Sequence, residues 1–179
     1  MKKFFKLLGF LLFTVSNSLE LRFQSQTLGK FIISCRIIGL KMMGMRIGNK
    51  TRIHTYFYTN NPALIKIGSN CEIGRNAEIW AYDEVNIEDN VEIGSRLYVN
   101  TSNHKFNEGN QEALSKQGSD SSQIQIGKNS WIGANVNILS GVLIEQDVVI
   151  GANSVVNKNL ETKCVYAGCP ARKINEIKQ

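Results

Sequence analysis

Two histidines, His54 and His104, are the side chains of this 179-residue chain best suited to proton transfer at neutral pH. His104 ends a regular run of aliphatic residues, and a long polar stretch, residues 105–123, follows it directly. An imidazole at such a junction is expected at the coil surface, where it can exchange protons with a ligand at neutral pH. His104 is therefore the candidate catalytic residue, against the alternative of an ordinary surface histidine. His54 has no such stretch beside it and is the weaker candidate.

The same side chains exclude several kinds of metal and redox site. Two histidines cannot supply a three-histidine zinc site within one subunit. The four cysteines include no C-x-x-C pair and form no disulfide-dense framework. We expect no bound metal, and reduced thiols as in a cytosolic protein.

A repeat of six residues organises the part of the chain around His104. Aliphatic residues recur at every sixth position, which fits neither the 3.6-residue period of an α-helix nor the two-residue period of an ordinary strand. A period of six is typical of a parallel β-helix, in which each hexapeptide forms one short strand and one turn. With three hexapeptides per coil we expect about five coils. The repeat is clearest at Ile126, Ile132, Ile138, Ile144, Ile150 and Val156, and recurs at Ile67, Ile73, Ile79, Val85, Ile87, Ile93 and Val99.

The repeat divides the chain into three parts. Residues 47–161 are predicted to form the β-helix, which the polar excursion at residues 105–123 interrupts. A loop of this length in a compact domain is usually functional, so we expect it to cover a substrate. Residues 162–179 leave the repeat and end in ARKINEIKQ, for which we predict a short C-terminal helix.

Residues 1–46 form a basic, apolar N-terminal segment. Residues 1–52 carry ten Lys or Arg against one acidic residue, whereas the rest of the chain has eleven basic and fourteen acidic residues. The apolar run Leu7–Val15 is too short to span a bilayer, and no signal-peptide cleavage site follows it. Two interpretations stay open: helices that cap the end of the β-helix, and an amphipathic element on an anionic membrane surface. No nucleic-acid recognition motif accompanies the basic residues, so we expect no nucleic acid as a partner.

Residues Ile87 to Ile174, about half of the chain, resemble the hexapeptide-repeat acyltransferases. The motifs are IEDNVEIG, TSNH before a polar loop, IGKNSWIGANVNILSGVLI, VIGANSVVNK and AGCPARKI, in that order. They look most similar to the sugar O-acetyltransferase branch, which includes galactoside, maltose and colanic-acid acetyltransferases. The motifs identify the family but not the acceptor.

The resemblance implies a left-handed parallel β-helix, a homotrimer with sites between neighbours, and acetyl-CoA as co-substrate in the cytoplasm, with possible residence at the inner membrane face. His104 matches the family's general base, which deprotonates a hydroxyl of a sugar or cell-envelope glycan precursor for direct attack on the thioester. The residues that match the family's coenzyme A contacts are Trp131, Ala134, Ala152, Asn157, Lys158 and Arg172.

The chain departs from the family pattern at three places. Asn175 replaces a basic residue found in some relatives, so contact with the phosphate is either weaker or made by Lys173, and Gln123 replaces a proline at the loop exit. No acidic residue matches the family's partner of the catalytic histidine, and Glu108 is one candidate for it. Two alternatives remain: an acetyltransferase for a small acceptor, such as an amino sugar, serine or an antibiotic, and a non-catalytic β-helical scaffold.

Overall fold

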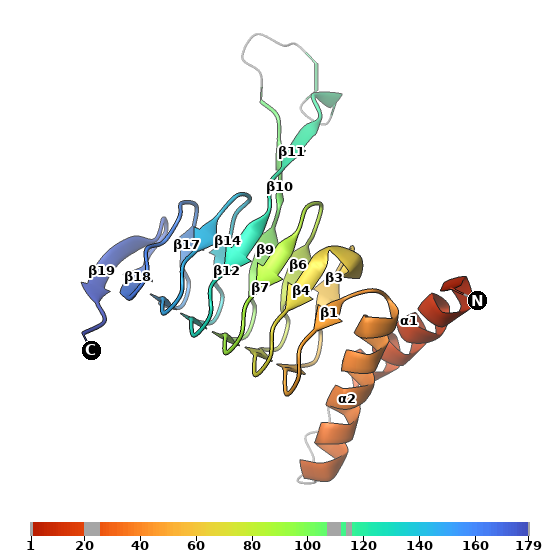
Figure 1. The fold of residues 1–179 in the computed structure, drawn as a ribbon. Coiled ribbons are helices and arrows are strands. Elements are labelled where there is room, and N and C mark those ends of the chain that lie inside the picture. The colour runs from red at the N-terminus through yellow and green to blue at the C-terminus, as the bar shows by residue number, and fades with distance from the viewer. Residues whose placement is uncertain (1, 20–25, 107–111, 114–115, 179) are drawn as a thin grey trace.

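The computed structural model describes residues 2–19, 26–106, 112–113 and 116–178, and its body is a mostly parallel β-helix (Figure 1). Five complete coils and part of a sixth stack along one axis, as the six-residue period predicts. Each complete coil contributes one strand to each of three parallel sheets. The β-helix prediction is confirmed, and the hand of the coil stays a prediction.

The three sheets contain the following strands. The first sheet contains β1 (Arg46–Ile47), β4 (Ile65–Ile67), β7 (Val85–Ile87), β12 (Ile124–Ile126) and β15 (Leu143–Ile144). The second contains β2 (Arg52–Ile53), β5 (Glu72–Ile73), β8 (Glu92–Ile93), β13 (Trp131–Ile132), β16 (Val149–Ile150), β18 (Cys164–Ala167) and β19 (Arg172–Glu176). The third contains β3 (Tyr58–Thr59), β6 (Glu78–Trp80), β9 (Tyr98–Asn100), β14 (Asn137–Ile138) and β17 (Val155–Val156).

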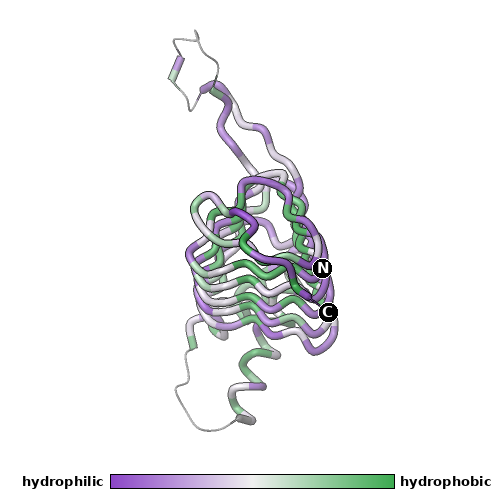
Figure 2. Tube along the Cα trace, turned by 90° about the vertical axis from the view of Figure 1, so that its left-hand side faces the viewer, coloured by the Kyte–Doolittle hydropathy of each residue, from purple (hydrophilic) through white to green (hydrophobic). Residues whose placement is uncertain are grey.

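The core is a stack of aliphatic side chains inside the coils. Ile126, Ile132 and Ile138, one from each sheet of the fourth coil, are completely buried, and their equivalents in neighbouring coils are buried as well. Hydrophobic and hydrophilic segments therefore recur at the same places in successive coils (Figure 2). Burial of a full aliphatic side chain stabilises the fold by about 1.5–3 kcal/mol, so the stacked anchors supply the main stabilising term.

Two corners of each coil require a left-handed backbone conformation. In the first five coils the third residue after each anchor of the first two sheets has a positive φ, and asparagine, which tolerates this region best among non-glycine residues, is the commonest choice. At the first corner these side chains also hydrogen-bond from coil to coil. Asn70 donates to Asn90 (3.2 Å), Asn90 to Asn129 (3.1 Å) and Asn129 to Asp147 (3.1 Å).

The third corner, which follows the strands of the third sheet, receives all the extra residues. Ile47 and its register partner Ile67 are twenty residues apart, whereas Ile126 and Ile144 are eighteen apart. The first insertion forms a 3₁₀ turn, η1 (Pro62–Leu64). The third is the predicted excursion, which projects from the body (Figure 1). It leaves the coil earlier than predicted, because β10 (Ser102–His104) and β11 (Ser119–Ser121) pair as an antiparallel ribbon.

Two helices, α1 (Lys2–Ser18) and α2 (Gln26–Met42), cover the N-terminal end of the β-helix. They cross closely at Gly9 and Gly39, where a Cβ on Gly39 would lie 2.7 Å from the carbonyl oxygen of Gly9. The guanidinium of Arg36, which is 1% exposed, donates to the carbonyl oxygens of Ile53 (2.6 Å) and Ser16. This buried side chain therefore ties both helices to the first coil.

The predicted C-terminal helix is wrong. Residues Arg172–Glu176 form β19, which runs antiparallel to β18. Strand β18 ends the parallel sheet and would otherwise expose its backbone donors and acceptors along one edge. Pairing with β19 satisfies these groups, which outweighs the helical appearance of the sequence.

Candidate active site

His104 lies at the end of β10, in the stem of the projecting ribbon. Its Cα pairs with that of Ser119 on β11, and its side chain is exposed. The adjacent ion pair between Lys105 Nζ and Asp120 Oδ1 (2.9 Å) joins the two strands of the stem. Within the described part of the chain no side chain hydrogen-bonds to the imidazole, and Glu108, the candidate partner, lies outside the described residues. The imidazole is therefore open to a substrate.

Trp131 stands on the outer face of the second sheet. Its side chain is 55% exposed, and its register neighbours on β8 and β16 are Glu92 and Val149. It lines one end of a cavity of about 270 Å³ that runs along this sheet. An aromatic ring held in this way offers a flat apolar surface to a ligand.

Ala134 and Ala152 occupy equivalent positions at the second corner of successive coils. The backbones approach closely here, since a Cβ on Gly133 would lie 2.6 Å from the amide nitrogen of Ala152. The carbonyl oxygen of Ala134 accepts a hydrogen bond from the amide of Asn153 (2.9 Å). Among the described residues, the N–H groups of both alanines have no hydrogen-bond partner. Two open donors on a line of small side chains suit the amide carbonyls of a pantetheine arm.

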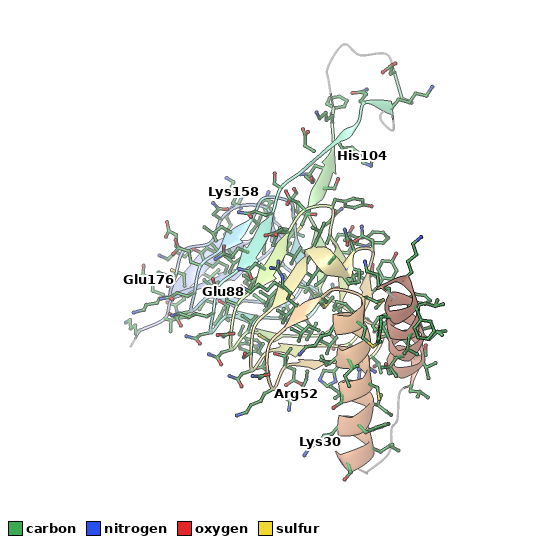
Figure 3. The ribbon with its side chains drawn as sticks, turned by 45° about the vertical axis from the view of Figure 1, so that its right-hand side comes forward. Lys30, Arg52, Glu88, His104, Lys158 and Glu176 are labelled. Atoms are coloured by element: carbon green, nitrogen blue, oxygen red, sulfur yellow. The ribbon has the colours of Figure 1, made fainter. Side chains whose placement is uncertain are left out.

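The basic residues predicted to contact the phosphates lie near the C-terminal end of the coils. Asn157 and Lys158 directly follow β17 and are exposed at the third corner, the corner from which the His104 ribbon projects (Figure 3). Arg172 begins β19, and its Nη1 donates to the carbonyl oxygen of Ala171 (2.9 Å). Lys173 is engaged by Glu176 (2.7 Å), and this hydrogen bond raises the pKa of Lys173 above its ordinary value.

One subunit does not bring all of these residues together. Trp131, Ala134 and Ala152 lie on neighbouring coils of one side, whereas His104 stands on the ribbon and does not line the Trp131 cavity. Trp131 belongs to the second sheet, while the ribbon leaves from the end of the third. A single chain therefore presents the parts of a site without assembling them.

The structure also shows a polar cluster at His54, the histidine that the sequence indicates as the weaker candidate. His54 Nε2 lies 2.8 Å from Oε1 of Glu72, and Arg52 pairs with the other carboxylate oxygen. Burial opposes ionisation of Glu72, but the hydrogen bonds from Arg52 and His54 hold its pKa below the ordinary value. The length of the coil is the sequence feature that could have indicated this cluster, because Arg52 and Glu72, twenty residues apart, are register partners on adjacent coils.

Two further classes of site find no support in the part of the chain that the structure covers. No group of three or more His, Cys, Asp or Glu side chains is arranged to hold a metal ion there. Over the same residues, no helix has both the length and the hydrophobicity needed to cross a bilayer.

Two family models match the coils. Residues 123–158 match the bacterial transferase hexapeptide (six repeats), and residues 64–100 match the hexapeptide repeat of succinyl-transferase. These two stretches are the clearest runs of the six-residue period, on either side of the ribbon.

Curated relatives and a solved structure are similar over much of the chain. Galactoside O-acetyltransferases of Escherichia coli K12 and Lactococcus lactis are 38% and 30% identical to it, over 77% and 76% of this chain and 66% and 67% of their own. WbbJ of Escherichia coli K12, named as a candidate lipopolysaccharide biosynthesis O-acetyl transferase, is 30% identical over 63% of this chain and 61% of its own. The chain thus spans about two thirds of the length of these relatives. A galactoside acetyltransferase solved in complex with coenzyme A superimposes with a TM-score of 0.76, at 29% identity, over 99% of this chain and 82% of that chain.

Proposed function

The chain belongs to the hexapeptide-repeat acyltransferases, in the branch of the sugar O-acetyltransferases, and from this membership we propose that it transfers acetyl from acetyl-CoA to a hydroxyl group of a sugar or cell-envelope glycan precursor. The observation that carries the proposal is the likeness, over nearly the whole chain, to a structure that holds coenzyme A. The open N–H groups of Ala134 and Ala152 support it, because they fit the ligand that the related structure contains.

His104 is the proposed general base. A sugar hydroxyl attacks a thioester poorly until a base removes its proton in the transition state. The hydroxyl oxygen forms a bond to the acetyl carbon as its proton passes to the imidazole, and the carbon–sulfur bond then breaks. The imidazolium returns the proton to the departing thiolate, which gives the acetyl ester and coenzyme A. Exposure of His104 at the ribbon stem supports this role.

The second and third corners of the C-terminal coils are the proposed coenzyme A site. The N–H groups of Ala134 and Ala152 would hold the pantetheine arm, with the ring of Trp131 beside it. Asn157, Lys158 and Arg172 would contact the adenosine and its phosphates, for which exposed cations are suited.

We also propose that the active protein is a homotrimer with each site between two neighbours. The separation of His104 from the Trp131 side supports this arrangement, because a neighbouring subunit can bring a ribbon to that side. Flat parallel faces associate readily into closed rings, in which every subunit makes the same contacts.

The acceptor is proposed to belong to the cell envelope. The name of the relative WbbJ supports a glycan precursor over a small soluble acceptor. The alternative of an amino sugar, serine or antibiotic acceptor predicts activity that is independent of any membrane. The alternative of a non-catalytic scaffold predicts that the protein does not bind coenzyme A.

The helical cap is proposed to contact the cytoplasmic face of a membrane. Both helices carry lysines and neither contains an acidic residue. Ten large apolar side chains of these helices are exposed, although both helices are fixed to the coils. Basic helices with exposed apolar side chains suit an anionic lipid surface. The exposed apolar residues are Phe4, Phe5, Leu7, Leu8, Phe10, Leu11, Val15, Leu28, Phe31 and Ile38.

Co-sedimentation with lipid vesicles tests this contact. The full chain should bind vesicles that contain phosphatidylglycerol and bind weakly to phosphatidylcholine alone. The triple change Phe4→Ser, Leu7→Ser, Phe10→Ser should weaken binding about tenfold or more, since it removes exposed apolar area. Phe106→Ser is the matched control, because Phe106 is 71% exposed but lies on the ribbon. Equal loss in both variants would rule out a specific role for the cap.

Thiol release from acetyl-CoA in the presence of a panel of sugars and glycan precursors tests the catalytic proposal. His104→Ala should lower turnover by about 10²–10⁴-fold, the usual contribution of a general base, and leave coenzyme A binding nearly unchanged. Equal turnover in the variant would remove His104 from the mechanism. A wild-type protein that neither binds coenzyme A nor turns over would favour the scaffold.

A further inference from the structure

Two cavities meet beneath the helical cap. One, of about 270 Å³, runs along the second sheet from His54 to Trp131, and the other, of about 150 Å³, lies between the cap and the first two coils. His54 and Arg75 line both cavities. The two cavities therefore adjoin, and an extended ligand that follows these two side chains would reach from the cap to the Trp131 side.

The cavity along the sheet has the lining expected for a sugar. Glu72, Glu92 and Ser95 present oxygen atoms that accept hydrogen bonds from hydroxyl groups, and His54 adds an imidazole. Trp131 closes the far end with an exposed ring against which the apolar side of a sugar can pack. Together, these hydrogen-bond acceptors, the guanidinium of Arg75 and one aromatic ring suit a neutral ligand that is rich in hydroxyl groups.

The cavity beneath the cap has a different chemistry. Its walls combine the aliphatic side chains of Leu19, Ile32 and Ile33 with Arg36, His54 and Arg75, and no carboxylate is among the described residues that line it. A site that is apolar on one side and cationic on the other suits a phosphate attached to a hydrocarbon chain.

Buried polar atoms beside this cavity lack partners. Arg36 is 1% exposed and Thr55 is 8% exposed, and Nε of Arg36 and Oγ1 of Thr55 have no hydrogen-bond partner within the described residues. Leaving a buried donor unpaired is unfavourable, so these atoms are suited to a ligand that accepts hydrogen bonds. Burial lowers the pKa of Arg36 to about 10, which leaves the guanidinium charged at neutral pH.

We propose that the joined cavities are the acceptor site and that the acceptor is a sugar linked through a phosphate to a lipid. The sugar lies along the second sheet, the phosphate lies by Arg36, His54 and Arg75, and the lipid leaves along Ile32 and Ile33. The inference rests on the proposed acetyl transfer, and it explains why the exposed apolar cap adjoins the cavity. A membrane-bound cap would place the cavity at the lipid surface.

Binding of farnesyl phosphate to the full chain by calorimetry tests the proposal, with farnesol and inorganic phosphate as comparison probes. Farnesyl phosphate should bind more tightly than either probe, since only it offers both chemistries. Arg75→Gln and His54→Gln should each weaken its binding about tenfold or more, the effect expected for loss of a charge-assisted hydrogen bond. Arg46→Gln, the same charge change on the first sheet, should leave it unchanged.

Each contrary result has a distinct meaning. Equal binding of farnesyl phosphate and farnesol would overturn the phosphate site, and equal binding of inorganic phosphate would overturn the lipid-linked acceptor. Equal loss in the Arg46 variant would reduce the effect to general charge. Coenzyme A binding, measured on the same preparations, separates these outcomes from failure of the proposed acetyltransferase activity.

Discussion

At the scale of single residues, Glu72 is the side chain on the second sheet that both Arg52 and His54 contact. Its carboxylate accepts hydrogen bonds from Arg52 and His54, while its side chain stays one-third exposed. Partial exposure limits such pairs to about 0–1 kcal/mol, so the cluster contributes more to fixing side-chain positions than to stability. It holds the imidazole of His54 at the junction of the two cavities.

Glu72→Gln should lower the melting temperature slightly at pH 7 and have little effect at acidic pH. The pKa of Glu72 lies below its ordinary value of 4.5 in the folded chain, so its stabilisation is present above that pH. It is lost as the pH falls through the lower, folded-state pKa. Thermal unfolding followed by circular dichroism at pH 7 and at stepwise lower pH measures this.

Glu92→Gln is the matched control for that prediction. Glu92 is the register neighbour of Glu72 one coil further on, and it has no ion pair within the described residues. Its replacement should leave the pH dependence of stability nearly unchanged. A melting-temperature difference for Glu72→Gln that is the same at every pH would show that the ion pairs are not its cause.

At the scale of elements, the close approach of successive coils is the most restrictive feature. Gly74→Ala should lower the free energy of unfolding by about 1–3 kcal/mol, because the new Cβ would lie 2.5 Å from the carbonyl carbon of Gly94. Gly29→Ala in α2 adds a Cβ with nothing within 4 Å of it and should stabilise the helix by about 0.5–1 kcal/mol. Urea unfolding compares the two, and a similar change in both would contradict the packing argument.

The elements that could be predicted from the sequence are those that repeat. Each coil buries an aliphatic residue at every sixth position, so the burial of residues such as Ile132 can be predicted from their spacing alone. The strand Arg172–Glu176 could not be predicted in this way, because its partner β18 is the last parallel strand of the second sheet and the six-residue period does not continue beyond it. The N-terminal helices could be expected from their apolar composition. Their attachment to the first coil could not, because it depends on the contact of Arg36 with Ile53.

The same distinction between what the local sequence pattern indicates and what it does not applies to the candidate site. His104 could be found because it stands where the repeat stops. The contact of His54 with Glu72 was missed, because recognising it requires both the length of the first coils and the corner that receives the extra residues. The joined cavities depend on how the cap lies over the coils, which no local pattern specifies.

At the scale of the whole molecule, the placement of His104 away from the Trp131 side predicts complementation between subunits. Mixing His104→Ala and Trp131→Glu chains, each nearly inactive alone, should restore about a quarter of wild-type activity after random assembly into trimers. Each mixed trimer would contain one intact site out of three. Thiol release after co-refolding, with size measured by light scattering, checks this; no recovery would place His104 and Trp131 in the same subunit's site.

All extra residues leave the coils at the third corner, so during evolution the insertions can change while the coils stay the same. The insertions after β3 and β6 are equally short, since register partners across each are twenty residues apart, whereas Ile87 and Ile126 across the third are thirty-nine apart. The strands before and after all three nevertheless keep their register. Lengthening or replacing the ribbon therefore disturbs neither the stacked core nor the corner that holds Ala134 and Ala152. A lineage can acquire new ribbons on an unchanged body, so similarity between two proteins in their coils need not extend to their ribbons.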